Sequence, residues 1–174
     1  MIVTIDGPAG SGKSTVARLL AERLNLRFLD TGAMYRAVAL AVLKASADEN
    51  HHTAVAEVAK GVSISFDEDR LLLNAQDVTS EIRSPEVTAI SSIVAANPEV
   101  RKRLVELQRD IGKLGNMVTE GRDQGTVVFP DAEHKFFAAD SGNLRMRAFS
   151  RLSRLSWNSF ANATNATKLA STRP

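Results

Sequence analysis

The sequence predicts an α/β fold, in which a parallel β-sheet lies between two layers of helices. Short β-rich apolar runs alternate with helix-like segments along most of the 174 residues, and this alternation is typical of parallel sheets covered by helices. The first apolar run, residues 2–6, leads directly into a glycine-rich segment and then into a helical pattern. The composition, 44% hydrophobic and 24% charged, is that of one globular domain. Without cysteine, disulfides, thiol catalysis and cysteine-ligated zinc are excluded.

The glycine-rich segment matches the G-x-x-x-x-G-K-[S/T] phosphate-binding pattern. It reads Gly7-Pro8-Ala9-Gly10-Ser11-Gly12-Lys13-Ser14-Thr15. The glycines allow successive N–H groups to turn inward around an anion, and the helix N-terminus that follows adds its own free N–H groups. Lys13 supplies a charge for the β- and γ-phosphates of a nucleoside triphosphate, and the Ser14 hydroxyl is placed to ligate Mg²⁺. An accidental Lys-Ser after a glycine turn is the alternative. Because a strand precedes the loop and a helix follows it, we predict a P-loop NTPase three-layer fold.

The next elements have local signals. Residues 27–30 form a short apolar strand, and a helix over 31–44 follows with Thr31 as its expected N-cap. Another helix is expected at 47–60. Residues 62–66 alternate with period two and are separated by an acidic turn from the apolar run 70–74, so a β-hairpin is predicted.

Two later helices are predicted from a capping residue that directly precedes a proline. Ser84-Pro85-Glu86 and Asn97-Pro98-Glu99 predict helices over 85–96 and 98–114. Further core strands are expected at 117–119 and 135–138. The hairpin and its flanking helices are interpreted as an insertion over one edge of the parallel sheet.

Three further clusters separate this chain from other phosphate-loop proteins. They are the run 30–36, which follows a strand and contains Thr31 and Arg36; Arg101 on a predicted helix; and the run 120–130, which contains Arg122-Asp123. Arginine's planar fork suits a phosphate, and Asp and Thr can bind ribose or base edges. Taken singly, Arg36 and Arg101 could be solvated helix residues, and Arg122-Asp123 a local ion pair.

Together these residues resemble the bacterial cytidylate kinase family. The resemblance is carried by Ile-Asp-Gly-Pro-Ala-Gly-Ser-Gly-Lys-Ser-Thr, Leu-Asp-Thr-Gly-Ala-Met-Tyr-Arg, Glu-Gly-Arg-Asp-x-Gly-Thr-Val-Val-Phe-Pro-Asp-Ala, residues 77–87 and Val100-Arg101, and it runs from Ile2 to about Phe137. It implies transfer of the ATP γ-phosphoryl group to CMP or dCMP, with Lys13, Arg122 and Asp123 as catalytic residues. The substrate site it implies is Thr31, Arg36, Arg101, Arg122 and Asp123. Gln124 departs from the family, which often has an aliphatic residue there.

The resemblance also implies a division of the chain. Residues 1–140 would form the kinase core, and residues 62–96 within it a monophosphate-binding insertion. Residues 141–174 are expected to be a divergent basic tail, which leaves the fold C-terminally incomplete. From Phe136 onward there are six basic residues and one acidic residue, a net charge of +5.

We hypothesise that a frameshift explains this tail. Back-translation of residues 162–169 with G/C-ending codons gives, in another frame, Arg-Asp-Glu-Arg-Asp-Glu-Ala, which is like the lid of the family. The gene's reading frames test this hypothesis, which fails if none encodes an Arg-Asp-x-x-Asp run. A basic nucleic-acid-binding arm and a disordered extension are the alternatives. Loss of lid arginines would lower the rate by about 10³–10⁵-fold, so nucleotide binding with poor turnover is expected.

Other function classes fit less well. A GTPase switch would want an Asn-Lys-x-Asp motif, which the sequence lacks, and a different small-molecule kinase would not explain Arg101 and Arg122-Asp123. A non-catalytic nucleotide-binding remnant stays open. With no secretory signal and no run of about 20 apolar residues, we expect a cytoplasmic monomer that binds small molecules and neither nucleic acid nor membranes.

Overall fold

The computed structural model describes residues 1–67 and 69–138, together with the backbone of 146–148. The chain forms two compact units. The first comprises Met1–Asp30 and the residues from Arg109 onward, and the second comprises Thr31–Gln108. Among the described residues, no helix combines the length and the apolar character needed to cross a membrane.

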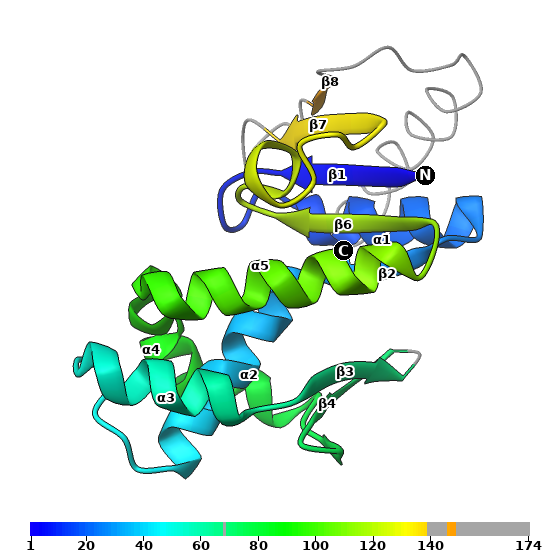
Figure 1. Ribbon diagram of the computed structural model, residues 1–174. Helices are drawn as coiled ribbons and strands as arrows, with labels where there is room; N and C mark the ends of the chain where they lie inside the picture. Colours follow the sequence, from blue (N-terminus) through cyan, green and yellow to red (C-terminus); the bar gives the residue numbers. More distant parts are fainter. Residues whose placement is uncertain (68, 139–145, 149–174) are drawn as a thin grey trace, which may run out of the picture. The chain divides into compact units, whose positions relative to one another are not determined.

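The first unit is built on a sheet with the strand order β2-β6-β1-β7-β8. Its strands are β1 (Ile2–Asp6), β2 (Arg27–Asp30), β6 (Met117–Gly121), β7 (His134–Ala138) and β8 (Met146–Ala148). Figure 1 shows β6, β1 and β7 side by side. The first four strands run parallel, whereas β8 pairs antiparallel with β7. The parallel sheet confirms the predicted α/β fold. Strand β8 was not predicted and lies in the segment interpreted as a divergent tail, most of which is outside the described residues.

One face of this sheet forms the main apolar core of the unit. Helix α1 (Lys13–Leu24) packs there because its buried residues recur at helical spacing. The core residues are Val3, Ile5, Val16, Ala17, Leu20, Ala21, Val118 and Phe136. Since strand residues alternate between faces, Thr4 and its register partner Thr119 point to the opposite face.

On that opposite face the chain after β6 is held by the last turns of helix α5 (Pro98–Lys113). This stretch contains the π-helical turn η2 (Gln124–Val128). The Arg109 guanidinium donates from Nη2 to the Val127 carbonyl at 2.8 Å and from Nε to the Val128 carbonyl at 3.0 Å. The segment after β6 is therefore tied to the body of the first unit.

The second unit is arranged around helix α2 (Thr31–Lys44), which contacts α3, η1 and α4. The other helices of this unit are α3 (His52–Gly61), η1 (Glu81–Arg83), α4 (Pro85–Ala96) and most of α5. An antiparallel sheet is formed by β3 (Ile64–Asp67), β4 (Arg70–Leu73) and β5 (Gln76–Asp77). The predicted hairpin and the two proline-led helices are therefore confirmed.

Two helix starts in this unit differ from the sequence prediction. Helix α3 begins at His52 rather than at residue 47, because His51 caps it by accepting the Ala54 N–H on Nδ1 at 3.2 Å. Helix α2 includes Thr31 as its first residue, directly after β2, so Thr31 is not the residue before the helix.

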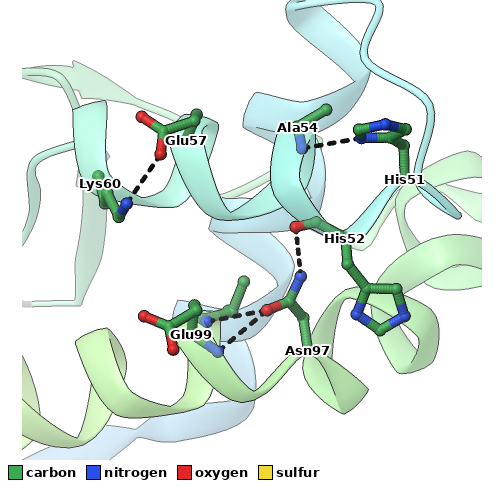
Figure 2. Close-up of polar contacts among 8 residues, drawn as sticks. His51, His52, Ala54, Glu57, Lys60, Asn97 and Glu99 are labelled. Carbon is green, nitrogen blue, oxygen red and sulfur yellow. Dashed lines mark hydrogen bonds and ion pairs between the residues drawn. The ribbon is translucent and has the colours of Figure 1, made fainter.

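Asn97 joins the starts of α3 and α5 within the second unit. Figure 2 shows its side chain between His52 and Glu99. Its Nδ2 donates to the His52 carbonyl at 2.8 Å, and its Oδ1 accepts the N–H groups of Glu99 and Val100 at 3.0 and 3.4 Å. Asn97 is only 3% exposed, so one buried side chain satisfies three backbone groups.

Candidate functional site

The predicted phosphate-binding loop connects β1 to α1 at the carboxyl edge of the sheet. Gly7 has no space for a side chain, because a Cβ there would lie 2.7 Å from the Ala138 carbonyl oxygen. Gly12, the N-cap of α1, has a φ of 76°, a conformation that favours glycine. The first backbone hydrogen bond of the helix runs from Val16 N–H to the Gly12 carbonyl at 3.2 Å. The N–H groups of helix residues 13–15 therefore precede the helical ladder and form an anion-binding end.

The two side chains predicted to be functional at this helix start, those of Lys13 and Ser14, both contact one carboxylate. Lys13 Nζ lies 3.6 Å from Glu120 Oε2 and donates to the Pro8 carbonyl at 3.1 Å. Ser14 Oγ donates to Glu120 Oε1 at 3.0 Å. Glu120 lies near the end of β6, beside β1, and the side chains of Lys13 and Glu120 are 11% and 6% exposed. The structure thus brings Lys13 and Ser14 to one buried acid.

The pKa of Glu120 is raised in this position. Burial raises its pKa most, and the neighbouring carboxylate of Asp30 raises it further. Asp30 is the register partner of Glu120 on β2. Lys13 and the Ser14 hydroxyl act in the opposite direction but do not outweigh the burial. The resulting balance leaves the ionised carboxylate less favourable than it is in water.

Three oxygen-bearing side chains beside Lys13 make a suitable environment for a small hard cation. Ser14, Glu120 and Asp30 offer a hydroxyl and two carboxylates, the ligand types that Mg²⁺ prefers. No group of three or more His, Cys, Asp or Glu side chains suited to a metal occurs in the part of the chain that the structure describes. The ligand types of Ser14, Glu120 and Asp30 are compatible with Mg²⁺, and the predicted role of Ser14 as a metal ligand stays a prediction.

A second carboxylate at this edge connects β1 to the loop of Arg122 and Asp123. Asp6 is 6% exposed, and its Oδ1 and Oδ2 accept the backbone N–H groups of Gln124 and Gly125 at 2.7 and 2.8 Å. Burial raises the Asp6 pKa above its ordinary value, although these two hydrogen bonds act in the opposite direction. Arg122 is exposed and Asp123 half-buried. Two of the three predicted catalytic residues, Arg122 and Asp123, therefore lie on a loop that is attached to the last residue of β1.

The remaining predicted substrate residues belong to the second unit. Thr31 is buried at the start of α2, Arg36 is half-buried on the same helix, and Arg101 is half-buried on α5. Arg122 and Asp123 belong to the first unit. Their common role in one substrate site stays a prediction.

Asp6, Asp30, Glu120 and Gln124 lie near the site but were not predicted as part of it. Asp6 and Glu120 were quoted only as members of motifs, although a charged residue at the end of a buried strand is itself unusual. Gln124, noted as a departure from the family, is 1% exposed, and its Oε1 accepts the Thr119 hydroxyl at 2.9 Å. Its amide is therefore accommodated by a polar partner on the sheet.

Comparisons with known proteins show the family of the chain. The family model for cytidylate kinase matches residues 3–170. The chain is 51% identical over 148 residues to a cytidylate kinase of Mycobacterium leprae (strain Br4923), covering 84% of this chain and 66% of the relative. It is 47% identical over 151 residues to the cytidylate kinase of Geobacter sp. (strain M21), covering 84% of this chain and 65% of that protein. The chain thus spans slightly less than two thirds of the length of these relatives. It belongs to the cytidylate kinase family.

Proposed function

We propose that this chain transfers the γ-phosphoryl group of ATP to CMP or dCMP, giving CDP or dCDP. The observation that carries the proposal is the pairing of Lys13 and Ser14 with Glu120 at the opening of α1. Lys13 is a cation at the start of helix α1, where its Nζ contacts Glu120 and the Pro8 carbonyl. The loop of Arg122 and Asp123 follows β6, the strand that carries Glu120. Membership of the family supports the choice of a cytidine monophosphate as the acceptor.

On the donor side, the loop 7–15 binds the triphosphate of ATP. The free N–H groups at the start of α1 donate to phosphate oxygens, and Lys13 Nζ exchanges Glu120 for the β- and γ-phosphates. Ser14 Oγ would hold Mg²⁺, with Glu120 and Asp30 beside it. When bound, Mg²⁺ neutralises charge on the β- and γ-phosphates.

On the acceptor side, the exposed guanidinium of Arg122 binds the monophosphate, and Asp123 contacts the nucleoside. The family resemblance adds Thr31, Arg36 and Arg101 to this site. Phosphoryl transfer asks little covalent work of a protein, so positioning and charge neutralisation supply most of the catalysis. The proposal is for a monomer acting on small molecules.

CDP formation tests the proposal. The intact chain is incubated with ATP, Mg²⁺ and one of CMP, dCMP, UMP or AMP, and the diphosphate product is quantified by chromatography. We expect product with CMP or dCMP, and none with Lys13→Met. A folded protein that forms neither CDP from CMP nor dCDP from dCMP, and that binds no CMP, would overturn the proposal.

A second candidate is a protein that binds both nucleotides but turns them over poorly. It follows from the expectation that residues 141–174 form a divergent basic tail. The same assay separates the two, because an intact kinase of this kind works at about 1–100 s⁻¹. A rate in that range would contradict the second candidate, and a rate about 10³-fold lower would support it.

A further inference from the structure

The carboxylate of Asp6 has a place in the site that the mechanism above does not use. Asp6 is the last residue of β1 and immediately precedes the phosphate-binding loop. Its two oxygens are occupied by the N–H groups of Gln124 and Gly125, the two residues that follow Arg122-Asp123. We propose that Asp6 is a positioning residue for the acceptor phosphate, because its carboxylate fixes the loop that presents Arg122. This inference rests on the proposed function.

The geometry fixes that loop at both ends from β1. Before Arg122, Gly121 is the register partner of Asp6, and its carbonyl accepts the Gly7 N–H at 3.2 Å. After Asp123, the Asp6 carboxylate holds the next two N–H groups. The Arg122-Asp123 dipeptide is therefore a short span between two attachments, one to Gly7 directly after β1 and one to Asp6 at the end of β1, which limits where the guanidinium can lie.

The loop after Asp123 is closed by further backbone bonds. The Asp123 carbonyl accepts the N–H groups of Val127 and Val128 at 2.9 and 3.2 Å. Those bonds belong to the η2 turn and do not attach it to β1. The Asp6 carboxylate makes that attachment, and it does so where the turn begins.

A carboxylate is the side chain that this position requires. Two backbone donors converge on it, and an ionised carboxylate accepts both without offering a hydrogen of its own. Asparagine has nearly the same shape, but its NH₂ group would face one of the two N–H groups. Asp6→Asn therefore loses one of the charge-assisted bonds and gains a repulsive contact, while the volume of the side chain is conserved.

The neighbouring residue Thr4 provides a matched control. It points to the same face of β1 as Asp6, and a Cβ on Gly125 would lie 2.7 Å from its Oγ1. Thr4 is fully buried, and its Oγ1 has no hydrogen-bond partner in the described part of the chain. Thr4→Val changes the same buried layer without removing an attachment of the loop.

Binding titrations of the intact chain give the first test. Asp6→Asn should weaken CMP binding at least 10-fold and change ATP binding less than 3-fold, because the attachment acts on the acceptor loop. Thr4→Val should leave both within 3-fold of wild type. In the double variant with Arg122→Ala, CMP should bind no more weakly than it does to Arg122→Ala alone, because Asp6 acts through Arg122. Independent, additive losses would overturn the inference, as would equal losses for ATP and CMP.

Amide hydrogen exchange gives the second test and does not depend on CMP. Exchange at Gln124 and Gly125 should rise at least 10-fold in Asp6→Asn, with Val118 and Thr119 in β6 unchanged. Unchanged exchange at 124 and 125 would overturn the inference. If Asp6→Asn does not fold, Asp6→Ser is measured in its place with the same expectations. Failure of wild type to bind CMP would contradict the proposed function, and the exchange result would still decide whether Asp6 holds the loop.

Discussion

Replacing Glu120 by glutamine should leave the protein at least as stable as wild type at pH 8, although the change removes an ion pair with Lys13. The pair is close and buried, with Nζ and Oε2 3.6 Å apart. At an effective dielectric constant of about 20, this attraction is worth about 4–5 kcal/mol. Burying a carboxylate costs several kcal/mol, and Asp30 adds repulsion.

The raised pKa of Glu120 decides which effect is larger. Because the pKa is raised despite Lys13 and the Ser14 hydroxyl, burial and Asp30 together outweigh the attraction. Glutamine keeps the volume and can still accept the Ser14 hydroxyl, but it carries no charge to desolvate. The folded wild-type protein holds the Glu120 proton more tightly than the unfolded chain. Its stability therefore falls as the pH rises from the ordinary carboxyl range through the raised pKa.

Urea unfolding followed by circular dichroism at pH 5, 6.5 and 8 measures this effect. The Glu120→Gln variant should gain on wild type as the pH rises. Lys13→Met is the contrasting variant, because it leaves Glu120 beside Asp30 without a cation. It should lose about 3–5 kcal/mol at pH 8 and less at pH 5, where Glu120 is more protonated. A loss of similar size for Glu120→Gln at pH 8 would refute the reasoning.

Two further predictions concern the free energy of unfolding, and each compares a substitution with a matched control. Asn97→Ala should lower the free energy of unfolding by about 2–3 kcal/mol, because it leaves buried backbone groups without a partner; Asn50→Ala, at an exposed position, should change it by less than about 0.5 kcal/mol. Gly112→Ala should cost about 1–3 kcal/mol, because its Cβ would lie 2.7 Å from Cε1 of Phe129. Gly61→Ala, where a Cβ meets nothing within 4 Å, should instead gain up to about 1 kcal/mol. Urea unfolding of the four variants checks both, and equal effects within either pair would contradict them.

Local signals in the sequence predicted the elements that surround the phosphate loop. The predicted strand 2–6 is β1, and the predicted helix after Gly12 is α1. Both were predictable because apolar periodicity and the placement of glycines are visible within a few residues. The start of α3 was missed for a local reason as well. Histidine is not among the usual N-cap residues, so the cap at His51 carried no recognisable signal.

The contacts that define the site were beyond sequence reasoning because they are not local. Asp6 and the Gln124 N–H that it accepts are 118 residues apart, and Ser14 and Glu120 are 106 residues apart. Motifs placed these residues at strand ends, but only the register of β1 with β6 shows which side chains meet. The predicted insertion at 62–96 stays a prediction, while the compact second unit extends over Thr31–Gln108. Most of the predicted tail, 141–174, lies outside the described residues.

Calorimetric titration of the intact chain with ATP·Mg²⁺ and, separately, with CMP tests the central claim most directly. Wild type should bind both nucleotides. Lys13→Met should weaken ATP binding and Arg122→Ala should weaken CMP binding, each by about 10–100-fold, the range expected for a lost hydrogen bond to a charged group. Each variant should leave the other nucleotide nearly unaffected. A folded wild-type protein that binds neither nucleotide, or two variants that weaken the same nucleotide alone, would contradict the account.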